Sequence, residues 1–140
     1  MDWSKKLQIL NSISKNTLME TLDIRFADVG EDFLVATMPV NSKVYQPMGL
    51  LHGGATVALA ESVGSAASHL FIDNDTFTVR GIEITANHLR SKKTGTLTAT
   101  AHILHKGTTT HLWKIEMTDE QGRLISFCKL TNIILPKTKN

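Results

Sequence analysis

Apolar and polar residues alternate with a period of two along most of the C-terminal half of the chain. The alternating segments are residues 82–90, 97–103, 113–117 and 124–135. This pattern is typical of strands that turn one face to the core, so Ile82, Ile84 and Ala86 are expected on one buried face. Because the connections between the segments are short, the four strands are expected to form an antiparallel meander in which chain neighbours are sheet neighbours.

The N-terminal half shows shorter elements. Leu7, Leu10 and Ile13 recur every three residues, which predicts an amphipathic helix over residues 5–14 with Ser4 as its cap. The other elements expected here are two short strands and then a loop: residues 23–29, 33–38 and 39–51.

Residues 54–71 are almost all small or apolar, and Glu61 is their only charged side chain apart from any protonation of His69. The segment is long enough for about five helical turns. A helix that is apolar nearly all round is expected to be buried. The economical architecture is a curved antiparallel sheet wrapped around this helix, an α+β fold forming a single domain over residues 1–140.

The composition is that of an ordinary globular protein, with 41% hydrophobic and 20% charged residues among 140. No apolar run approaches the ~20 residues that span a bilayer, and the N-terminus lacks a signal-peptide pattern, so a cytoplasmic protein without membrane contact is expected. A net charge of +2 is too small to indicate nucleic-acid binding. Cys128, the one cysteine, is expected to be a small buried hydrophobe rather than a nucleophile.

The stretch from Gln46 to Gly54, Gln-Pro-Met-Gly-Leu-Leu-His-Gly-Gly, leads into the central helix. Free backbone N–H groups and the positive end of the helix dipole suit a developing oxyanion, and Gly53 and Gly54 allow a substrate carbonyl to approach closely. Glu61 lies in an apolar helix, where a carboxylate needs a partner or a function. Ser65 follows one turn later on the same face, where its hydroxyl could position a water or the carboxylate.

Gly53 and Glu61 are eight residues apart, about 12 Å along a helix. Two groups so far apart are not expected to touch one carbonyl carbon. If both act on the same bond, they come from two copies of the helix packed side by side and antiparallel, in a two-fold dimer.

Each piece also has a plainer interpretation. A double glycine before a helix is often only a turn. A lone glutamate is as often a structural group as a catalytic one, His52 could simply cap or brace the loop, and Ser65 alone is more often a packing residue. Only the combination of these residues favours a catalytic site.

At these residues the sequence resembles the hotdog-fold thioesterases, in particular the 4-hydroxybenzoyl-CoA thioesterase branch. That branch includes phenylacetate-pathway thioesterases and 1,4-dihydroxy-2-naphthoyl-CoA hydrolases. The resemblance spans nearly the whole chain and is strongest at residues 46–65 and in Ile-Thr-Ala-Asn-His-Leu-Arg-Ser at 84–91. It implies a hotdog fold and a catalytic site assembled from two subunits.

The resemblance implies a role for each residue of the motif. Glu61 is the catalytic carboxylate, as nucleophile or as general base, and the Gly53 N–H polarises the thioester carbonyl. Gln46 and His52 bind and orient the thioester, and Ser65 assists the hydrolytic step. The coenzyme A moiety would lie along the remaining residues that the resemblance implicates: Gly81, His88, Arg90, Ser91, Lys106, Gly107 and Thr108. Arginine, lysine and turn amides suit phosphate oxygens, whereas Lys92 and Lys93 are expected to be solvated surface.

The predicted function is hydrolysis of an acyl-CoA or aryl-CoA thioester, without metal or cofactor, by a homo-oligomer that is a dimer at least and a dimer of dimers by family habit. Aromatic acyl groups, 1,4-dihydroxy-2-naphthoyl or benzoyl-type, are the leading expectation, and medium-chain fatty acyl groups are the alternative. A non-catalytic acyl-CoA-binding or sensing domain is the alternative function. An enoyl-CoA hydratase would need an Asp–His pair, and a serine hydrolase a Gly-x-Ser-x-Gly elbow; neither is apparent in the sequence.

Overall fold

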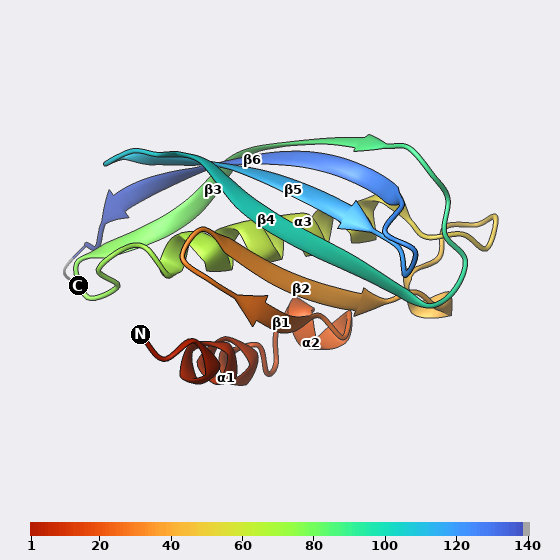
Figure 1. Ribbon diagram of the computed structural model, residues 1–140, viewed down its shortest axis with the longest axis horizontal. Coiled ribbons are helices and arrows are strands. Elements are labelled where there is room, and N and C mark those ends of the chain that lie inside the picture. Colours follow the sequence, from red (N-terminus) through yellow and green to blue (C-terminus); the bar gives the residue numbers. More distant parts are fainter. Residues whose placement is uncertain (139–140) are drawn as a thin grey trace.

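Six antiparallel strands form one sheet that curves around the long helix α3 in the computed structural model (Figure 1). The structure describes residues 1–138; the last two residues of the chain lie outside the described residues. The elements are α1 (Trp3–Ile13), α2 (Leu18–Thr21), β1 (Arg25–Val29), β2 (Phe33–Pro39), η1 (Ser42–Val44), α3 (Gly53–His69), β3 (Phe77–His88), β4 (Thr96–Lys106), β5 (Thr110–Thr118) and β6 (Leu124–Pro136). The predicted α+β architecture, a curved sheet around one central helix, is confirmed.

The strand order is β1-β2-β4-β5-β6-β3, so the predicted meander is only partly right. Strands β4, β5 and β6 are sheet neighbours as expected, but β3 pairs with β6 at the far edge instead of with β4. The reason is the connection at residues 89–95, which is long enough to pass along the end of the sheet. The backbone N–H groups of Leu89 and Arg90 both donate to the Ile125 carbonyl, which holds this connection against the start of β6.

Strand β3 contains a bulge that changes which side chains face inward. The register with β6 shifts between Gly81 and Glu83, so Ile82 is the extra residue. An extra residue interrupts the alternation of faces. Ile84 and Ala86 pack against the core, but Ile82 is 58% exposed, and its predicted burial is wrong.

Helix α3 has a buried face and an open face, whereas the sequence predicted burial all round. Leu59 and Val63 are fully buried against the concave side of the sheet, which contributes Leu97, Ile115 and Leu130. Glu61 is exposed on the opposite face. The two faces explain how one helix carries both core residues and a carboxylate.

Helix α1 begins at Trp3, and its cap is Asp2 instead of the predicted Ser4: the Asp2 side chain accepts a hydrogen bond from the Lys5 N–H at 3.1 Å. Its Asn11 side chain bonds to both backbone groups of Phe26 in β1, accepting from the N–H at 2.9 Å and donating to the carbonyl at 3.0 Å. Helix α1 is thereby fixed along the β1 edge. Within residues 1–138, no helix has the length and apolar character needed to cross a membrane.

Candidate active site

The loop before α3 folds back tightly, so that its two ends pair with each other. Tyr45 and Leu51 form an isolated antiparallel bridge, and the Gln46 N–H donates to the Leu50 carbonyl at 2.8 Å. Gly49 closes the inner turn with φ +76°, a conformation that glycine adopts without steric cost. The Gln46 side-chain oxygen accepts from the Met48 N–H, so the loop itself fixes the amide of Gln46.

The loop is tied to the connection that follows β3. The Leu51 N–H donates to the Lys92 carbonyl at 2.8 Å, and the Tyr45 hydroxyl donates to the Lys93 carbonyl at 2.5 Å. The Lys92 side chain is only 9% exposed and pairs with Glu120. Its predicted place on a solvated surface is therefore wrong, and Lys92 has a structural partner instead.

The N-terminus of α3 is capped by a histidine. The Gly54 N–H donates to His52 Nδ1 at 2.7 Å, which leaves the proton of a neutral ring on Nε2. The neighbouring Gly53 N–H makes no hydrogen bond with any of residues 1–138. A Cβ on Gly53 would lie 2.9 Å from His88 Nε2, so only glycine lets the His88 ring stand this close to that free N–H. His88 is held in place by a 2.8 Å hydrogen bond between its Nδ1 and the Ser126 hydroxyl.

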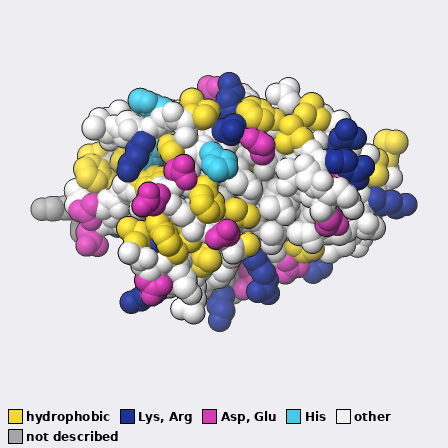
Figure 2. Space-filling model, viewed as in Figure 1, with side chains coloured by type: hydrophobic (Ala, Val, Ile, Leu, Met, Phe, Trp, Pro, Cys, Tyr) yellow, Lys and Arg dark blue, Asp and Glu magenta, His cyan; other side chains and the backbone are white. Residues whose placement is uncertain are grey.

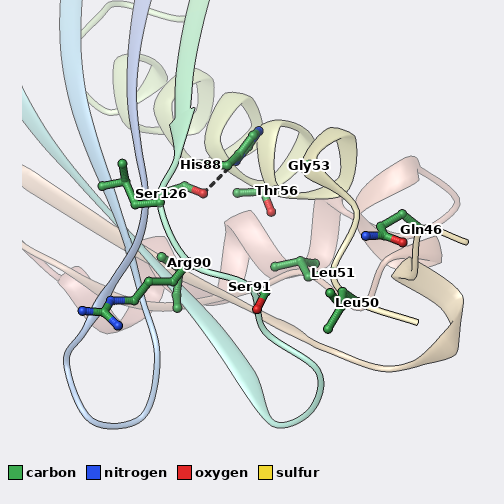
Figure 3. Close-up of a pocket in the computed structure, with 11 residues that line it drawn as sticks. Gln46, Leu50, Leu51, Gly53, Thr56, His88, Arg90, Ser91 and Ser126 are labelled. Carbon is green, nitrogen blue, oxygen red and sulfur yellow. Dashed lines mark hydrogen bonds between the residues drawn. The ribbon is translucent and has the colours of Figure 1, made fainter. Parts of the chain in front are cut away.

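These groups line a first pocket of about 320 Å³, shown in Figure 3. Five predicted site residues meet there. They are Gln46, Gly53, His88, Arg90 and Ser91. Gln46 and Arg90 lie on opposite sides of the pocket, with the N-terminus of α3 and His88 between them (Figure 3). A free helix-terminal N–H beside an imidazole suits a polarised carbonyl, and the arginine across the pocket suits an anionic group.

Glu61 and Ser65 line a second pocket, of about 450 Å³, between the open face of α3 and the N-terminal helices. Most of its other walls are apolar: Leu10, Ile13, Leu18, Met19, Phe26, Ala58 and Ala66. The Glu61 carboxylate forms no ion pair with any of residues 1–138. Its Oε1 lies in front of Gly81, where an added Cβ would be only 2.7 Å away.

Within one chain, the carboxylate and the free N–H thus line different pockets, separated by about 12 Å of helix. The structure also separates the predicted coenzyme A residues. His88, Arg90 and Ser91 lie at one end of the sheet, whereas the turn at residues 106–108 lies at the other end (Figure 1), where Lys106 Nζ sits 4.5 Å above the Phe71 ring. Gly81 lies between these ends, beside Glu61.

The thioesterase superfamily model matches residues 48–126, which include both pockets' central residues. The chain belongs to the thioesterase superfamily. It is 46% identical over 137 residues to the 1,4-dihydroxy-2-naphthoyl-CoA hydrolase of Escherichia coli, covering 96% of this chain and 100% of that protein. A solved thioesterase from Pseudomonas aeruginosa superposes with a TM-score of 0.92 at 43% identity, covering 94% of this chain and 94% of that one. A solved thioesterase from Haemophilus influenzae superposes with a TM-score of 0.92 at 37% identity, covering 100% of this chain and 99% of that one. The hotdog fold and a thioester hydrolase activity, both expected from the sequence, are confirmed.

Three polar residues of this thioesterase site escaped sequence reasoning. Thr56 and Ser126 are buried and line the first pocket, and Asn132 is fully buried behind Glu61 in β6. A signal existed for Asn132: it occupies an inward position of β6 in line with Cys128 and Leu130, where an apolar residue is the rule. Among residues 1–138 of the thioesterase, no group of three His, Cys, Asp or Glu side chains is placed to hold a metal ion.

Proposed function

We propose that this thioesterase hydrolyses an acyl-CoA or aryl-CoA at a site completed by two copies of the chain. One copy contributes Glu61, and the other contributes the Gly53 N–H. The observation that carries the proposal is the separation of the two half-sites: one pocket is lined by the Gly53 N–H but by no carboxylate, and the other is lined by the Glu61 carboxylate but not by that N–H.

Two features support pairing of the chains. Strand β3 is a 12-residue edge strand whose middle is largely exposed, and a long open edge is a template for pairing with another chain. The open face of α3 presents small residues around Glu61, including Gly54, Ala58 and Ser62. Small residues allow a second helix backbone to approach, and a two-fold operation would place the two copies of α3 antiparallel.

The proposed chemistry needs one donor and one carboxylate. The Gly53 N–H, at the positive end of α3, donates to the thioester oxygen as negative charge develops there. Glu61 of the other copy acts as nucleophile or as general base at the carbonyl carbon. The carbon–sulfur bond then breaks, and the departing thiolate takes up a proton. Gln46 and His52 orient the thioester, and Ser65 assists the water that completes hydrolysis.

The coenzyme A moiety is proposed to occupy the basic end of the molecule. Figure 2 shows Lys and Arg side chains close together at the right-hand end, where the connection after β3 lies in Figure 1. Arg90 and Ser91 at this end are exposed and suited to phosphate oxygens. In an antiparallel pair, the partner's turn with Lys106, Gly107 and Thr108 would approach the same end.

For the acyl group, we propose the second pocket and an aromatic substrate. Its apolar walls, among them Met19 and Phe26, surround the open side of Glu61 and offer a volume suited to one or two fused rings. The relative from Escherichia coli carries the name of a hydrolase for such a bicyclic acyl-CoA. The aromatic group is of the 1,4-dihydroxy-2-naphthoyl or the benzoyl type, and a medium-chain fatty acyl group is the alternative.

The experiment is a panel of CoA thioesters with a thiol-trapping dye, applied to the wild type and to Glu61→Gln. We expect the highest kcat/KM with an aromatic thioester and a loss of at least about 10³-fold in Glu61→Gln, because the variant removes the group that acts on the carbonyl. Retention of the wild-type rate by Glu61→Gln on the best substrate would refute the role of Glu61. Glu31→Gln, the same change at an exposed carboxylate in the turn between β1 and β2, is the matched control.

A further inference from the structure

Asn132 presents an unpartnered oxygen beside the Glu61 carboxylate. The residue is fully buried, and its Oδ1 accepts no hydrogen bond from any of residues 1–138. Leaving a buried acceptor unpaired costs free energy, so such groups are rare away from functional sites. Asn132 is paired with Gly81 across β3 and β6, and both Asn132 Oδ1 and Glu61 Oε1 border the space that a Gly81 side chain would fill, at 3.6 and 2.7 Å from that Cβ position.

The orientation of the Asn132 amide is fixed by its other bonds. Its Nδ2 donates to the Gly64 carbonyl at 3.2 Å and to the Ser68 hydroxyl at 2.8 Å. A carbonyl only accepts hydrogen bonds, so the amide nitrogen must face Gly64 and the amide oxygen must face Gly81.

The Ser68 hydroxyl strengthens this assignment. It also accepts from Trp113 Nε1 at 2.8 Å, so both of its lone pairs are used. Its own proton is then directed to His111 Nδ1, 2.8 Å away. This buried network fixes the orientation of the Asn132 amide and directs its oxygen to the space in front of Gly81, which Glu61 Oε1 also borders.

Two acceptors that border one space need a donor between them. A water molecule supplies two O–H groups, one for each oxygen, and leaves its lone pairs free. We propose that Asn132 Oδ1 and Glu61 together hold the hydrolytic water, and that Glu61 therefore acts as general base rather than as nucleophile. The inference rests on the proposed function of Glu61 and extends it to a second residue.

The step balances without a further reactant. The water oxygen forms a bond to the thioester carbonyl carbon as Glu61 accepts one of its protons. The second O–H stays directed at Asn132 Oδ1, which keeps a lone pair pointing at the carbonyl. The carbon–sulfur bond breaks, and the thiolate takes the proton from Glu61, giving the acid and free coenzyme A.

The test compares Asn132→Leu and Asn132→Ala with the wild type on the best substrate of the panel. Leucine fills the amide position with carbon, whereas alanine leaves room for a second water to act as acceptor. We expect kcat to fall about 10- to 100-fold for Asn132→Leu and less for Asn132→Ala, with KM within about threefold for both. A purely structural role predicts the opposite order, because alanine leaves the larger cavity and loses more stability.

Ser68→Ala is the matched control. It removes one hydrogen bond of the same buried network and lowers Tm, but the Gly64 carbonyl still fixes the Asn132 amide. Its kcat should therefore stay within about threefold of the wild type. The inference would be overturned if Asn132→Leu kept the wild-type kcat, or if Ser68→Ala lost as much kcat as Asn132→Leu.

A single turnover in H₂¹⁸O gives a further result, because direct attack of water on the thioester leaves the Glu61 carboxylate without label. Label in the Glu61 carboxylate instead would overturn the general-base role while leaving the proposed hydrolysis intact. Undiminished turnover by Glu61→Gln would instead refute the proposed role of Glu61, on which this inference rests.

Discussion

Because Gly81 has no side chain, there is space beside it for the Glu61 carboxylate. A methyl group there would come within 2.7 Å of Glu61 Oε1, the free end of a flexible side chain. We expect Gly81→Ala to lower kcat by about tenfold or more while Tm changes little, because the carboxylate can move away without disturbing the core. Steady-state kinetics and a thermal melt on the same sample check this; an unchanged kcat would contradict it.

Cys128 is 1% exposed, and burial raises the pKa of its thiol to about 11. The sequence-based prediction of a buried, small hydrophobe is confirmed. Since the thiolate is the reactive form, we expect no reaction of the native protein with a thiol-trapping dye within minutes, and one thiol per chain after unfolding in guanidinium. Rapid labelling of the native protein would contradict this protection.

His111 makes stability depend on pH. Burial lowers its pKa below 6.5, and the positive charges of Lys106 and His105 add to the effect. The unfolded chain therefore binds a proton at higher pH than the folded chain, and the free energy of unfolding decreases as pH falls below about 6.5. We expect Tm to fall between pH 7 and pH 5. Asn at position 111 keeps an acceptor for Ser68 without titrating, so His111→Asn should show a smaller fall; an equal fall would contradict this origin.

Sequence reasoning selected candidate site residues where a residue type is out of place locally. Glu61 in an apolar helix and Gly53 before that helix are such cases. Asn132 was missed because it lies within a strand whose other inward residues satisfied the period-two pattern. Its meaning depends on Gly64, Gly81 and Ser68, which only the fold brings next to it.

Among the elements, α3 shows how closely helix and sheet are packed. A Cβ on Gly64 would lie 2.5 Å from Leu130 Cδ2 and 3.2 Å from Ile115 Cδ1, both in fully buried side chains. Alanine gains about 1 kcal/mol of helix propensity over glycine, whereas overpacking a core costs about 1–3 kcal/mol. We expect Gly64→Ala to lower the free energy of unfolding by about 1 kcal/mol in a urea titration. A variant more stable than the wild type would contradict this expectation, because it would show that the Leu130 and Ile115 side chains can shift to make room for the added methyl group.

The faces of the strands were largely predictable, and so was the order β4-β5-β6, but the neighbour of β3 was not. Alternation correctly placed Leu97, Trp113 and Ile115 toward the core, because side-chain direction is a local property. The pairing of β3 with β6 depends on where residues 89–95 lead the chain, and the exposure of Ile82 depends on one bulge. Neither leaves a periodic signal in the sequence.

At the scale of the whole molecule, a site shared between chains predicts complementation. Glu61→Ala and Gln46→Ala damage different half-sites, so each pure variant should have little activity. After mixing and reassembly, half of the dimers are mixed, and each mixed dimer has one intact site, so about a quarter of the wild-type activity should return. No recovery after confirmed subunit exchange would contradict a shared site. A mass measurement in solution, expected to give two chains or a multiple of two, accompanies the test.

The hydrogen bonds of Asn11 to both backbone groups of Phe26 have a consequence for growth of the sheet. They occupy the N–H and carbonyl of Phe26, the second residue of the edge strand β1, and α1 lies along that edge. A sheet with two open margins could add chains without end and form fibres. Because the α1 side of β1 is closed in this way, the proposed pairing through β3 would end after a single addition and give a particle of finite size.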